Sequence, residues 1–295
     1  RELLRDYSAS VQSLDVPTAG KSWALNAGIY HASGEFVATV DSDTQLHPDA
    51  IIQMMRAFMA DPELGAATGS IQIEHPTEPP ASAFKYIINE CESLEYMASF
   101  VVGRQRQALS NSLYTLAGAF SFFRRSVLLS VPQYSNRTVS EDTDITFWIH
   151  REFPDVKIGC IAESIIYVEP VKDMEELYSQ RVRWQRGELE VMASHPSLMW
   201  KNAISPFGFS PIRTLVVDHS FAFPRAIWTF LLPVLFFLGY PLPLVVTAMI
   251  LLYGFYSPID RITQLMCYSL SDPAAKKRIV GAWWLFTVMP AYRFL

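Results

Sequence analysis

Two aspartates, Asp41 and Asp43, follow a short apolar run at residues 35–40 and are separated by one serine. If that run is a strand that bends into a loop, both carboxylates lie near the same point. Carboxylate oxygens are ligands that Mg²⁺ and Mn²⁺ prefer, and such an ion would in turn hold a diphosphate. A solvated turn with helix-capping aspartates produces the same pattern. The pair is therefore a candidate metal site that needs further support.

A second acidic group is the run Ser140, Glu141, Asp142, Thr143 and Asp144, which directly precedes an apolar helical segment. One interpretation is structural, because serine and acidic residues at a helix start cap its amide groups and complement its dipole. The other is chemical, because a carboxylate that faces a substrate cleft can accept a proton from an alcohol nucleophile as a general base. The residue types alone leave both interpretations open.

A third group, Gln180, Arg183 and Trp184, has the i, i+3, i+4 spacing that places side chains on one face of a helix. An amide, a guanidinium fork and an indole on one face can bind a diphosphate and stack on a sugar ring. An amphipathic helix at a membrane surface, with an extended arginine and an interfacial tryptophan, has the same composition. The spacing favours neither interpretation by itself.

The elements that must position these groups alternate between helical and strand-like patterns. In an α/β sheet of this kind, ligands bind at the carboxyl ends of the strands, where Asp41 and Asp43 stand. We expect the first strand to be a buried parallel one. The expected strands are 35–40, 66–73, 113–125 and 157–168. One expected helix begins near Lys21, and three others cover 48–59, 82–104 and 173–190.

The composition separates an acidic body from a basic tail. The chain has 295 residues, 50% of them hydrophobic and 18% charged, which excludes a disordered protein. Residues 1–190 hold 26 acidic and 16 basic side chains, a net −10, whereas residues 191–295 hold 3 acidic and 8 basic ones, a net +5. This asymmetry argues against nucleic acid as a partner of the body and indicates that the tail meets anionic membrane lipids.

The tail contains a charge-free stretch of 34 residues, 226–259. As a helix it would be about 51 Å long, against a hydrocarbon core of about 30 Å. The sequence turns at Gly239–Pro243, so we predict two spans, at 221–239 and 243–259. The alternative is a buried helical hairpin of a soluble protein.

Basic residues flank this hairpin on one side: Arg213 and Arg225 before it, and Lys276 to Arg278 after it. The positive-inside rule makes that side, and with it the body, cytoplasmic. We therefore expect a multi-pass protein of the cell membrane, with a bacterial inner membrane as its setting. The expected organisation is a catalytic domain at 1–200, an interfacial segment at 201–220, a transmembrane hairpin at 221–268, and a cytoplasmic loop with the start of an interfacial or third membrane helix at 269–295.

The three cysteines, Cys91, Cys160 and Cys267, are scattered without metal-ligand spacing. We expect them to be packing residues in a reducing compartment. The first residue is Arg1 and no signal-like segment follows it, so we expect the chain to be an internal piece of a longer protein.

Taken together, the motifs resemble those of family 2 inverting glycosyltransferases, and more narrowly the membrane-integrated processive synthases of cellulose, chitin, hyaluronan and poly-N-acetylglucosamine. The resemblance covers most of the chain and depends on the order of the motifs. They are Lys21-x-x-Ala-Leu-Asn26-x-Gly28, Asp41-Ser-Asp43, Gly118-Ala-Phe-x-x-x-Arg124-Arg125, Ser140-Glu-Asp142 and Gln180-x-x-Arg183-Trp184, followed by the membrane hairpin.

The resemblance implies a GT-A domain whose first strands would precede Arg1. It implies that Asp41 and Asp43 hold Mg²⁺ or Mn²⁺ and the diphosphate of a donor, and that Lys21 lines the nucleotide pocket. Gln180 and Arg183 would bind the donor diphosphate. Asp142 would be the general base, with serine where the family usually has threonine two positions before it, and Glu141 and Trp184 would contact the acceptor sugar.

The implied function is transfer of a sugar from a nucleotide-diphosphate sugar, UDP-linked, to an acceptor hydroxyl with inversion, extending a polysaccharide. The partners would be a growing glycan or lipid-linked acceptor and membrane lipids. One alternative is transfer of a single sugar to a lipid carrier. Two others come from different classes: a phosphatase or pump with Asp41 as nucleophile, and an inactive membrane scaffold. The phosphatase pattern places Thr or Val four residues after the first aspartate, where this chain has Gln45.

Overall fold

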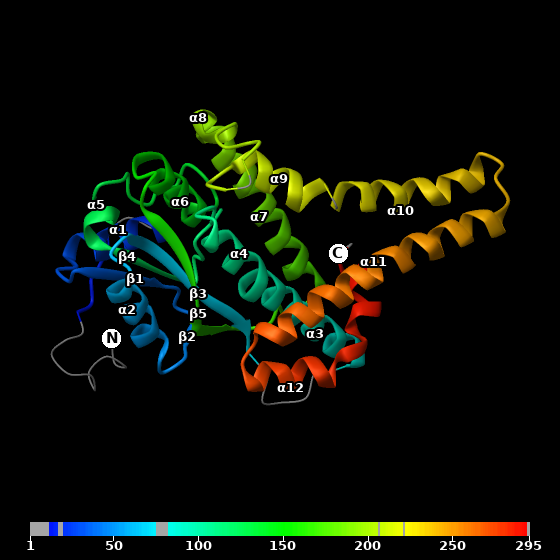
Figure 1. The fold of residues 1–295 in the computed structure, drawn as a ribbon, viewed down its shortest axis with the longest axis horizontal. Coiled ribbons are helices and arrows are strands. Elements are labelled where there is room, and N and C mark those ends of the chain that lie inside the picture. Colours follow the sequence, from blue (N-terminus) through cyan, green and yellow to red (C-terminus); the bar gives the residue numbers. More distant parts are fainter. Residues whose placement is uncertain (1–11, 17–19, 75–81, 206, 221, 294–295) are drawn as a thin grey trace.

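A computed structural model describes residues 12–16, 20–74, 82–205, 207–220 and 222–293. Its body is an α/β domain, from which a pair of long helices projects (Figure 1). Residues 17–19 of the loop expected before the first helix, and residue 221 at the expected start of the hairpin, lie outside the described residues.

The body is built on a mixed five-stranded sheet with the order β1-β4-β3-β5-β2. Only β3 and β5 pair in parallel; β1 with β4, β4 with β3, and β5 with β2 are antiparallel. We expected a parallel strand at 35–40. This prediction is wrong, because β1 pairs with β4 in the antiparallel sense and does not pair with β3. The strands are β1 (Phe36–Val40), β2 (Gln45–Leu46), β3 (Leu64–Ile73), β4 (Phe120–Arg124) and β5 (Lys157–Val168).

The helices of the body match the expected segments closely. The segment 82–104 is helical throughout, but it passes through a wider π-helical stretch, η2 (Ala98–Gly103), before it continues. The helix with the Gln180 motif begins at Met174 and is capped by Asp173, whose side chain accepts the Glu176 amide proton. The helices are α1 (Lys21–His31), α2 (Ala50–Ala60), α3 (Ala83–Met97), α4 (Arg104–Leu109), α5 (Arg125–Leu129), α6 (Glu141–Glu152), α7 (Met174–Ser194), α8 (Pro196–Met199) and α9 (Pro211–Ser220).

The central strand β3 is covered on both faces, because successive side chains of a strand point to opposite sides. Ala66 joins a cluster with Ile145 and Ile149 of α6, whereas Ala67 joins one with Met54 and Phe58 of α2. All six side chains are essentially inaccessible to solvent. The sheet is thus a rigid floor, and polar groups at the ends of its strands are held in fixed positions.

The three cysteines are free and buried, as expected of packing residues. Cys160 lies in the cluster beneath α6, and Cys91 and Cys267 lie in a cluster that joins α3 to the C-terminal part of the chain.

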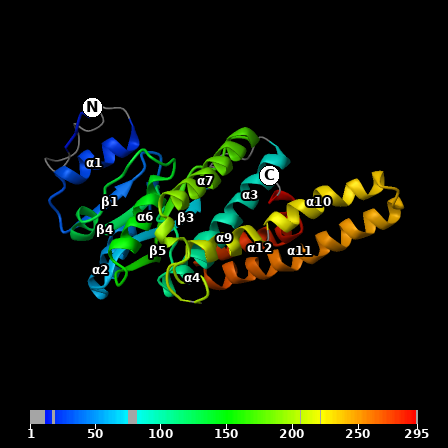
Figure 2. The ribbon, with the colours of Figure 1, turned by 90° about the horizontal axis from the view of Figure 1, so that it is seen from above.

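The predicted turn at Gly239–Pro243 separates two helices, α10 (Ala222–Phe237) and α11 (Leu242–Leu270), which run side by side (Figures 1 and 2). Among the described residues, α11 alone is long and apolar enough to cross a membrane, and only 6% of its apolar part is buried. The described part of α10 has 16 residues, fewer than the roughly 20 that one crossing needs. The hairpin is present, and its two crossings remain a prediction.

After α11 the chain folds back onto the body in three short helices: α12 (Pro273–Gly281), η3 (Trp283–Thr287) and α13 (Met289–Tyr292). Their apolar residues form one cluster with α3, the end of α11 and Leu177 at the start of α7. Arg278, which the charge pattern counted as a membrane flank, is mostly buried and pairs with Glu90 of α3. The segment 269–293 is therefore packed on the body, and its place relative to a membrane remains a prediction.

Candidate active site

The antiparallel pairing of β1 with β4 brings the end of β1 and the turn before β4 together. Val40 at the end of β1 lies opposite Phe120 at the start of β4. Consequently Asp41, which follows β1, lies beside the turn that precedes β4, and its amide donates to the carbonyl of Ala119 at 3.1 Å. The antiparallel pairing thus places Asp41 next to Gly118.

Asp142 reaches the same point from the first turn of α6. Its Oδ2 accepts the Gly118 amide proton at 2.9 Å, and its Oδ1 accepts that of Thr143 at 2.7 Å. A Cβ added to Gly118 would lie 3.2 Å from both Asp142 Oδ2 and the Nζ atom of Lys21. Glycine therefore fits where three elements converge, and it fixes the orientation of the Asp142 carboxylate.

Lys21 completes this group from the first residue of α1. Its Nζ lies 2.8 Å from Asp41 Oδ1 and 2.9 Å from Glu141 Oε1. Burial lowers the pKa of Lys21, but the bonds to the two carboxylates outweigh it and the pKa is raised. Lys21 is thus a firm cation. The structure brings four of the predicted site residues together, and we call Lys21, Asp41, Glu141 and Asp142 the carboxylate cluster.

The surroundings of the Asp142 carboxyl raise its pKa, as a general base requires. Burial raises its pKa, and the negative charge of Glu141 raises it further, against the amide of Thr143 and the charge of Lys21. A carboxylate with a raised pKa accepts a proton more readily than an ordinary one. Ser140, which we considered as the cap of α6, makes no capping hydrogen bond with its side chain. That part of the structural interpretation is wrong.

Asp43 stands in the exposed turn after Asp41. The described residues hold no group of three or more acidic, histidine or cysteine side chains that could bind an ion by themselves. Mg²⁺ is commonly held by one or two carboxylates together with the phosphates of a substrate. The two aspartates supply hard oxygen ligands of that number, so the residues fit an ion that binds together with a diphosphate.

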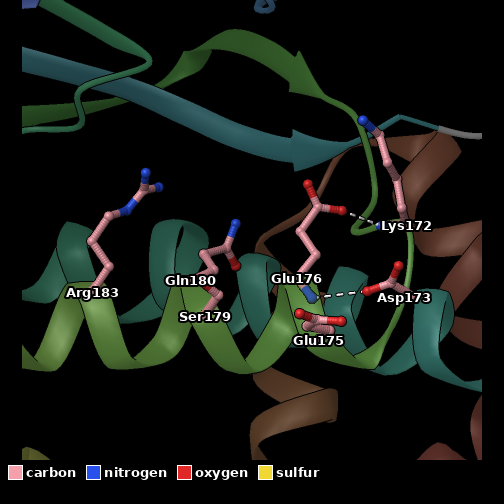
Figure 3. Close-up of a pocket in the computed structure, with 7 residues that line it drawn as sticks. All are labelled: Lys172, Asp173, Glu175, Glu176, Ser179, Gln180 and Arg183. Atoms are coloured by element: carbon pink, nitrogen blue, oxygen red, sulfur yellow. Dashed lines mark hydrogen bonds between the residues drawn. The ribbon is translucent and has the colours of Figure 1, made fainter.

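Gln180 and Arg183 lie on α7 and line a separate pocket of about 490 Å³ (Figure 3). Their side chains rise from the same side of the helix, as the spacing predicted. In the part of the chain that the structure describes, the Gln180 Oε1 atom is buried and has no hydrogen-bond partner. Within the described residues, no hydrogen bond or ion pair joins Gln180 or Arg183 to the carboxylate cluster. The other lining residues are Lys172, Asp173, Glu175, Glu176 and Ser179.

Trp184 is 41% exposed and meets Tyr96 of α3 edge to face, with ring centroids 6.3 Å apart. An exposed indole held at its edge leaves a face on which a sugar ring can stack. One turn further along α7, Gly187 packs directly on Ser140, so the helix of Trp184 lies against the start of α6. This contact relates the third predicted group to the carboxylate cluster.

Replacing Gly187 with alanine should destabilise the protein. A Cβ there would lie 1.9 Å from Ser140 Oγ and 2.7 Å from Ser140 Cβ. Overpacking costs about 1–3 kcal/mol and exceeds the gain of about 1 kcal/mol in helix propensity. We expect the melting temperature to fall by several degrees, at about 2–4 °C per kcal/mol.

Gly28→Ala in α1 is the matched control for Gly187→Ala, because among the described residues no atom outside the adjoining helix backbone lies within 4 Å of an added Cβ there. This substitution should leave the melting temperature unchanged or raise it slightly. Equal melting temperatures for the two variants would contradict the close approach of α7 to Ser140.

Sequence reasoning missed two contributors to the site. The first is Gly118, whose amide donates to the Asp142 carboxylate. The sequence indicated this glycine only as part of a motif and gave it no role. Arg181 lies inside the Gln180–Trp184 motif and is bonded to Glu95 of α3, and no local pattern pointed to that pair.

Comparisons with known proteins give a consistent assignment. A family model described as "Glycosyl transferase family group 2" matches residues 36–294. A poly-beta-1,6-N-acetyl-D-glucosamine synthase of Staphylococcus epidermidis is 30% identical over 191 residues, which are 65% of this chain and 44% of that protein. The synthase of the same name from Staphylococcus aureus (strain COL) is 30% identical over 173 residues, 59% of this chain and 40% of that protein. The chain thus spans less than half the length of these relatives.

Among solved structures, the mannosyltransferase PcManGT from Pyrobaculum calidifontis, in complex with GDP-Man and Mn²⁺, is similar with a TM-score of 0.47 and 15% identity. The similarity covers 94% of this chain and 65% of that one.

Proposed function

Because this chain belongs to the glycosyl transferase family group 2, we propose that it transfers a sugar from a UDP-linked donor to an acceptor hydroxyl with inversion, extending a polysaccharide. The observation that carries the proposal is the carboxylate cluster around Gly118. It combines one carboxylate beside a cation, Asp41, with another held by backbone amides, Asp142. These are the two kinds of carboxylate that such a transfer needs.

In the proposed reaction, Asp142 accepts the proton of the acceptor hydroxyl while that oxygen bonds to the anomeric carbon of the donor. The bond from the anomeric carbon to the diphosphate breaks, and its electron pair leaves with the nucleoside diphosphate. A single displacement from the opposite face inverts the anomeric carbon and needs no covalent enzyme intermediate. The raised pKa of Asp142 makes its carboxylate a competent acceptor for this proton.

Asp41 and Asp43 would hold Mg²⁺ or Mn²⁺. When bound, the ion supplies positive charge that neutralises the leaving diphosphate. Lys21, already paired with Asp41, adds a fixed positive charge to the nucleotide side of the site. We place the whole arrangement in a GT-A domain over residues 1–200.

Gln180 and Arg183 would contact the donor diphosphate, for which an amide and a guanidinium fork on one side of α7 provide the donors. Trp184 would stack on the terminal sugar of the acceptor, with Glu141 contacting the same sugar. The exposed Trp184 and the place of Gln180 and Arg183 in the lining of one pocket support these roles.

We place the catalytic domain on the cytoplasmic side of a cell membrane, a bacterial inner membrane, with residues 201–220 at the interface and 221–268 as a two-span hairpin. Residues 269–295 would lie on the cytoplasmic side and lead towards an interfacial or third membrane helix. The exposed apolar surface of α11 supports an environment of membrane lipids.

The length of the product separates a polymerase from an enzyme that adds one sugar to a lipid carrier. We expect the intact protein in nanodiscs to give a ladder of long products in gel or mass-spectrometric analysis. A single addition would replace the polymerase by that alternative. The phosphatase and scaffold alternatives lose support, because the family match includes Asp41, Asp142 and the α7 motif.

The pH dependence of transfer should depend on Glu141. A general base works when deprotonated, so transfer should be lost as the pH falls through the raised pKa of Asp142. Glu141→Gln removes a negative charge that raises this pKa, so the acidic limb of the kcat profile should move to lower pH. The profile is measured between about pH 4 and pH 8, a range that extends from the usual pKa of a carboxyl group to above that of histidine.

Glu152→Gln, at the exposed end of the same helix, is the control for Glu141→Gln. Its acidic limb should coincide with that of the unchanged protein. An acidic limb that stays in place or moves to higher pH in Glu141→Gln would contradict the coupling between Glu141 and Asp142.

A further inference from the structure

Arg181 points away from the pocket of its neighbours Gln180 and Arg183 and bonds to α3 instead. Its Nη1 donates to Glu95 Oε1 at 2.6 Å, and its Nη2 donates to Glu95 Oε2. Both side chains are about three-quarters buried. A two-pronged bond between a guanidinium and a carboxylate fixes orientation as well as distance, and it is among the stronger hydrogen-bonded pairs. Figure 2 shows α7 running beside α3, which this pair connects.

Tyr292, in the C-terminal helix α13, forms hydrogen bonds with both Arg181 and Glu95. The Tyr292 hydroxyl accepts from Arg181 Nη2 at 3.2 Å and donates to Glu95 Oε2 at 3.3 Å. Tyr292 itself is buried. Three parts of the chain that are far apart in sequence therefore meet at one guanidinium, and we call Glu95, Arg181 and Tyr292 the clamp.

The side of the clamp away from α7 is anchored firmly. Arg278 of α12 donates to both carboxylate oxygens of Glu90, at 3.1 and 3.0 Å, and both side chains are nearly buried. The apolar residues of α12, η3 and α13 pack with α3 in one cluster. Leu177, in the first turn of α7, belongs to this cluster as well, so the start of α7 is part of the unit formed by α3 and the C-terminal helices. The clamp holds α7 one turn further along, next to Gln180.

The clamp acts on the residues that the proposed function requires. The Arg181 guanidinium lies 5.4 Å from the centre of the Trp184 ring, three residues along α7. Tyr96, next to Glu95, touches the same indole. Arg181 is also the direct neighbour of Gln180. A change in the rotation of α7 would therefore move Gln180, Arg183 and Trp184 together.

We propose that Arg181 is a positioning residue, which the clamp uses to set the rotation of α7 and thereby the place of the diphosphate-binding and sugar-stacking side chains. This inference rests on the proposed function for the roles of Gln180, Arg183 and Trp184. The segment after α11, which contributes Tyr292 to the clamp, would then affect sugar transfer through the position of α7 and not through contact with a substrate.

The test uses the intact protein in nanodiscs with Glu95→Gln, Tyr292→Phe, Arg181→Gln and Arg181→Lys. A displacement of about 1 Å can cost up to about 10²-fold in rate, so we expect Glu95→Gln and Arg181→Gln to lower kcat by tenfold or more. The KM for the donor should change by less than about threefold, because contacts to the leaving diphosphate count most in the transition state. Arg181→Lys keeps the charge without the fork and should lie in between. Tyr292→Phe should give the smallest loss.

Arg186→Ala is the matched control, because Arg186 lies on α7, is 67% exposed and pairs with Glu190 on its own helix. It should leave kcat within about twofold, as for most exposed ion pairs. An equal loss of kcat in Arg186→Ala and Glu95→Gln would overturn the proposal. So would a fall in melting temperature in Glu95→Gln with kcat of the folded protein unchanged.

Amide hydrogen exchange separates this proposal from the proposed function, because it needs no sugar donor. Exchange across residues 178–188 should be faster in Glu95→Gln and Arg181→Gln, and unchanged in Arg186→Ala. Unchanged exchange in the first two variants would overturn the clamp even if sugar transfer is found. Faster exchange would support the clamp, whereas absence of transfer in the unchanged protein would overturn the proposed function alone.

Discussion

Asp142→Asn is expected to lower kcat by about 10²- to 10⁴-fold, the range that general bases contribute. Asparagine has nearly the same shape and its amide oxygen can still accept from the Gly118 amide, so the fold around the site should persist. It cannot take the proton of the acceptor hydroxyl. The loss should therefore appear in kcat. The measurement is the steady-state rate of sugar transfer by the intact protein in nanodiscs.

Two controls make this result specific to the base. Glu152→Gln, at the far end of α6, should transfer sugar at the normal rate, because its side chain is exposed and pairs with its neighbour Arg151. UDP binding by Asp142→Asn, measured by calorimetry, should resemble that of the unchanged protein. Transfer by Asp142→Asn at a near-normal rate would mean that another group accepts the proton.

Asp43→Asn is expected to lower transfer by about 10²- to 10³-fold, equivalent to about 3–4 kcal/mol of lost charge stabilisation. Asp43 is exposed and follows Asp41 in a turn, so its replacement leaves the packing of the sheet intact. What it removes is one of the two carboxylates that would hold the metal ion. The concentration of Mn²⁺ that gives half-maximal transfer should rise as well.

Asp49→Asn is the matched control for Asp43→Asn, since Asp49 is an exposed aspartate just before α2 and its neighbour is His47. It should leave both the rate and the Mn²⁺ dependence unchanged. A normal Mn²⁺ dependence in Asp43→Asn would place the metal, if the reaction uses one, away from this turn.

Local patterns predicted most elements of the body well, because the apolar periods of helices and strands are local properties. The strand expected at 113–125 is an exception, since β4 covers only Phe120–Arg124. The strand at 157–168 and the helix after Asp173 were found close to their predicted bounds. The pairing of β1 was not predictable in this way. Whether a strand joins a parallel or an antiparallel neighbour depends on where the chain returns, and here it returns through Gly118.

The residues of the site were predictable as types, and their assembly was not. Helical spacing correctly placed Gln180 and Arg183 on one side of α7. The distances of 2.8 and 2.9 Å from Lys21 to Asp41 and Glu141 depend on three elements that are separated by up to 120 residues. The bond between Arg278 and Glu90 joins parts of the chain 188 residues apart. Contacts of this kind follow from tertiary packing, which leaves no local signal in one sequence.

The most direct test of the proposed glycosyl transfer is to give the intact protein in nanodiscs a panel of radiolabelled UDP-sugars with Mg²⁺ or Mn²⁺, and to determine the anomeric configuration of the product by NMR. We predict transfer from one donor of the panel, with the configuration at the anomeric carbon inverted relative to that donor. No transfer from any donor, or a product that retains the configuration, would contradict the proposal.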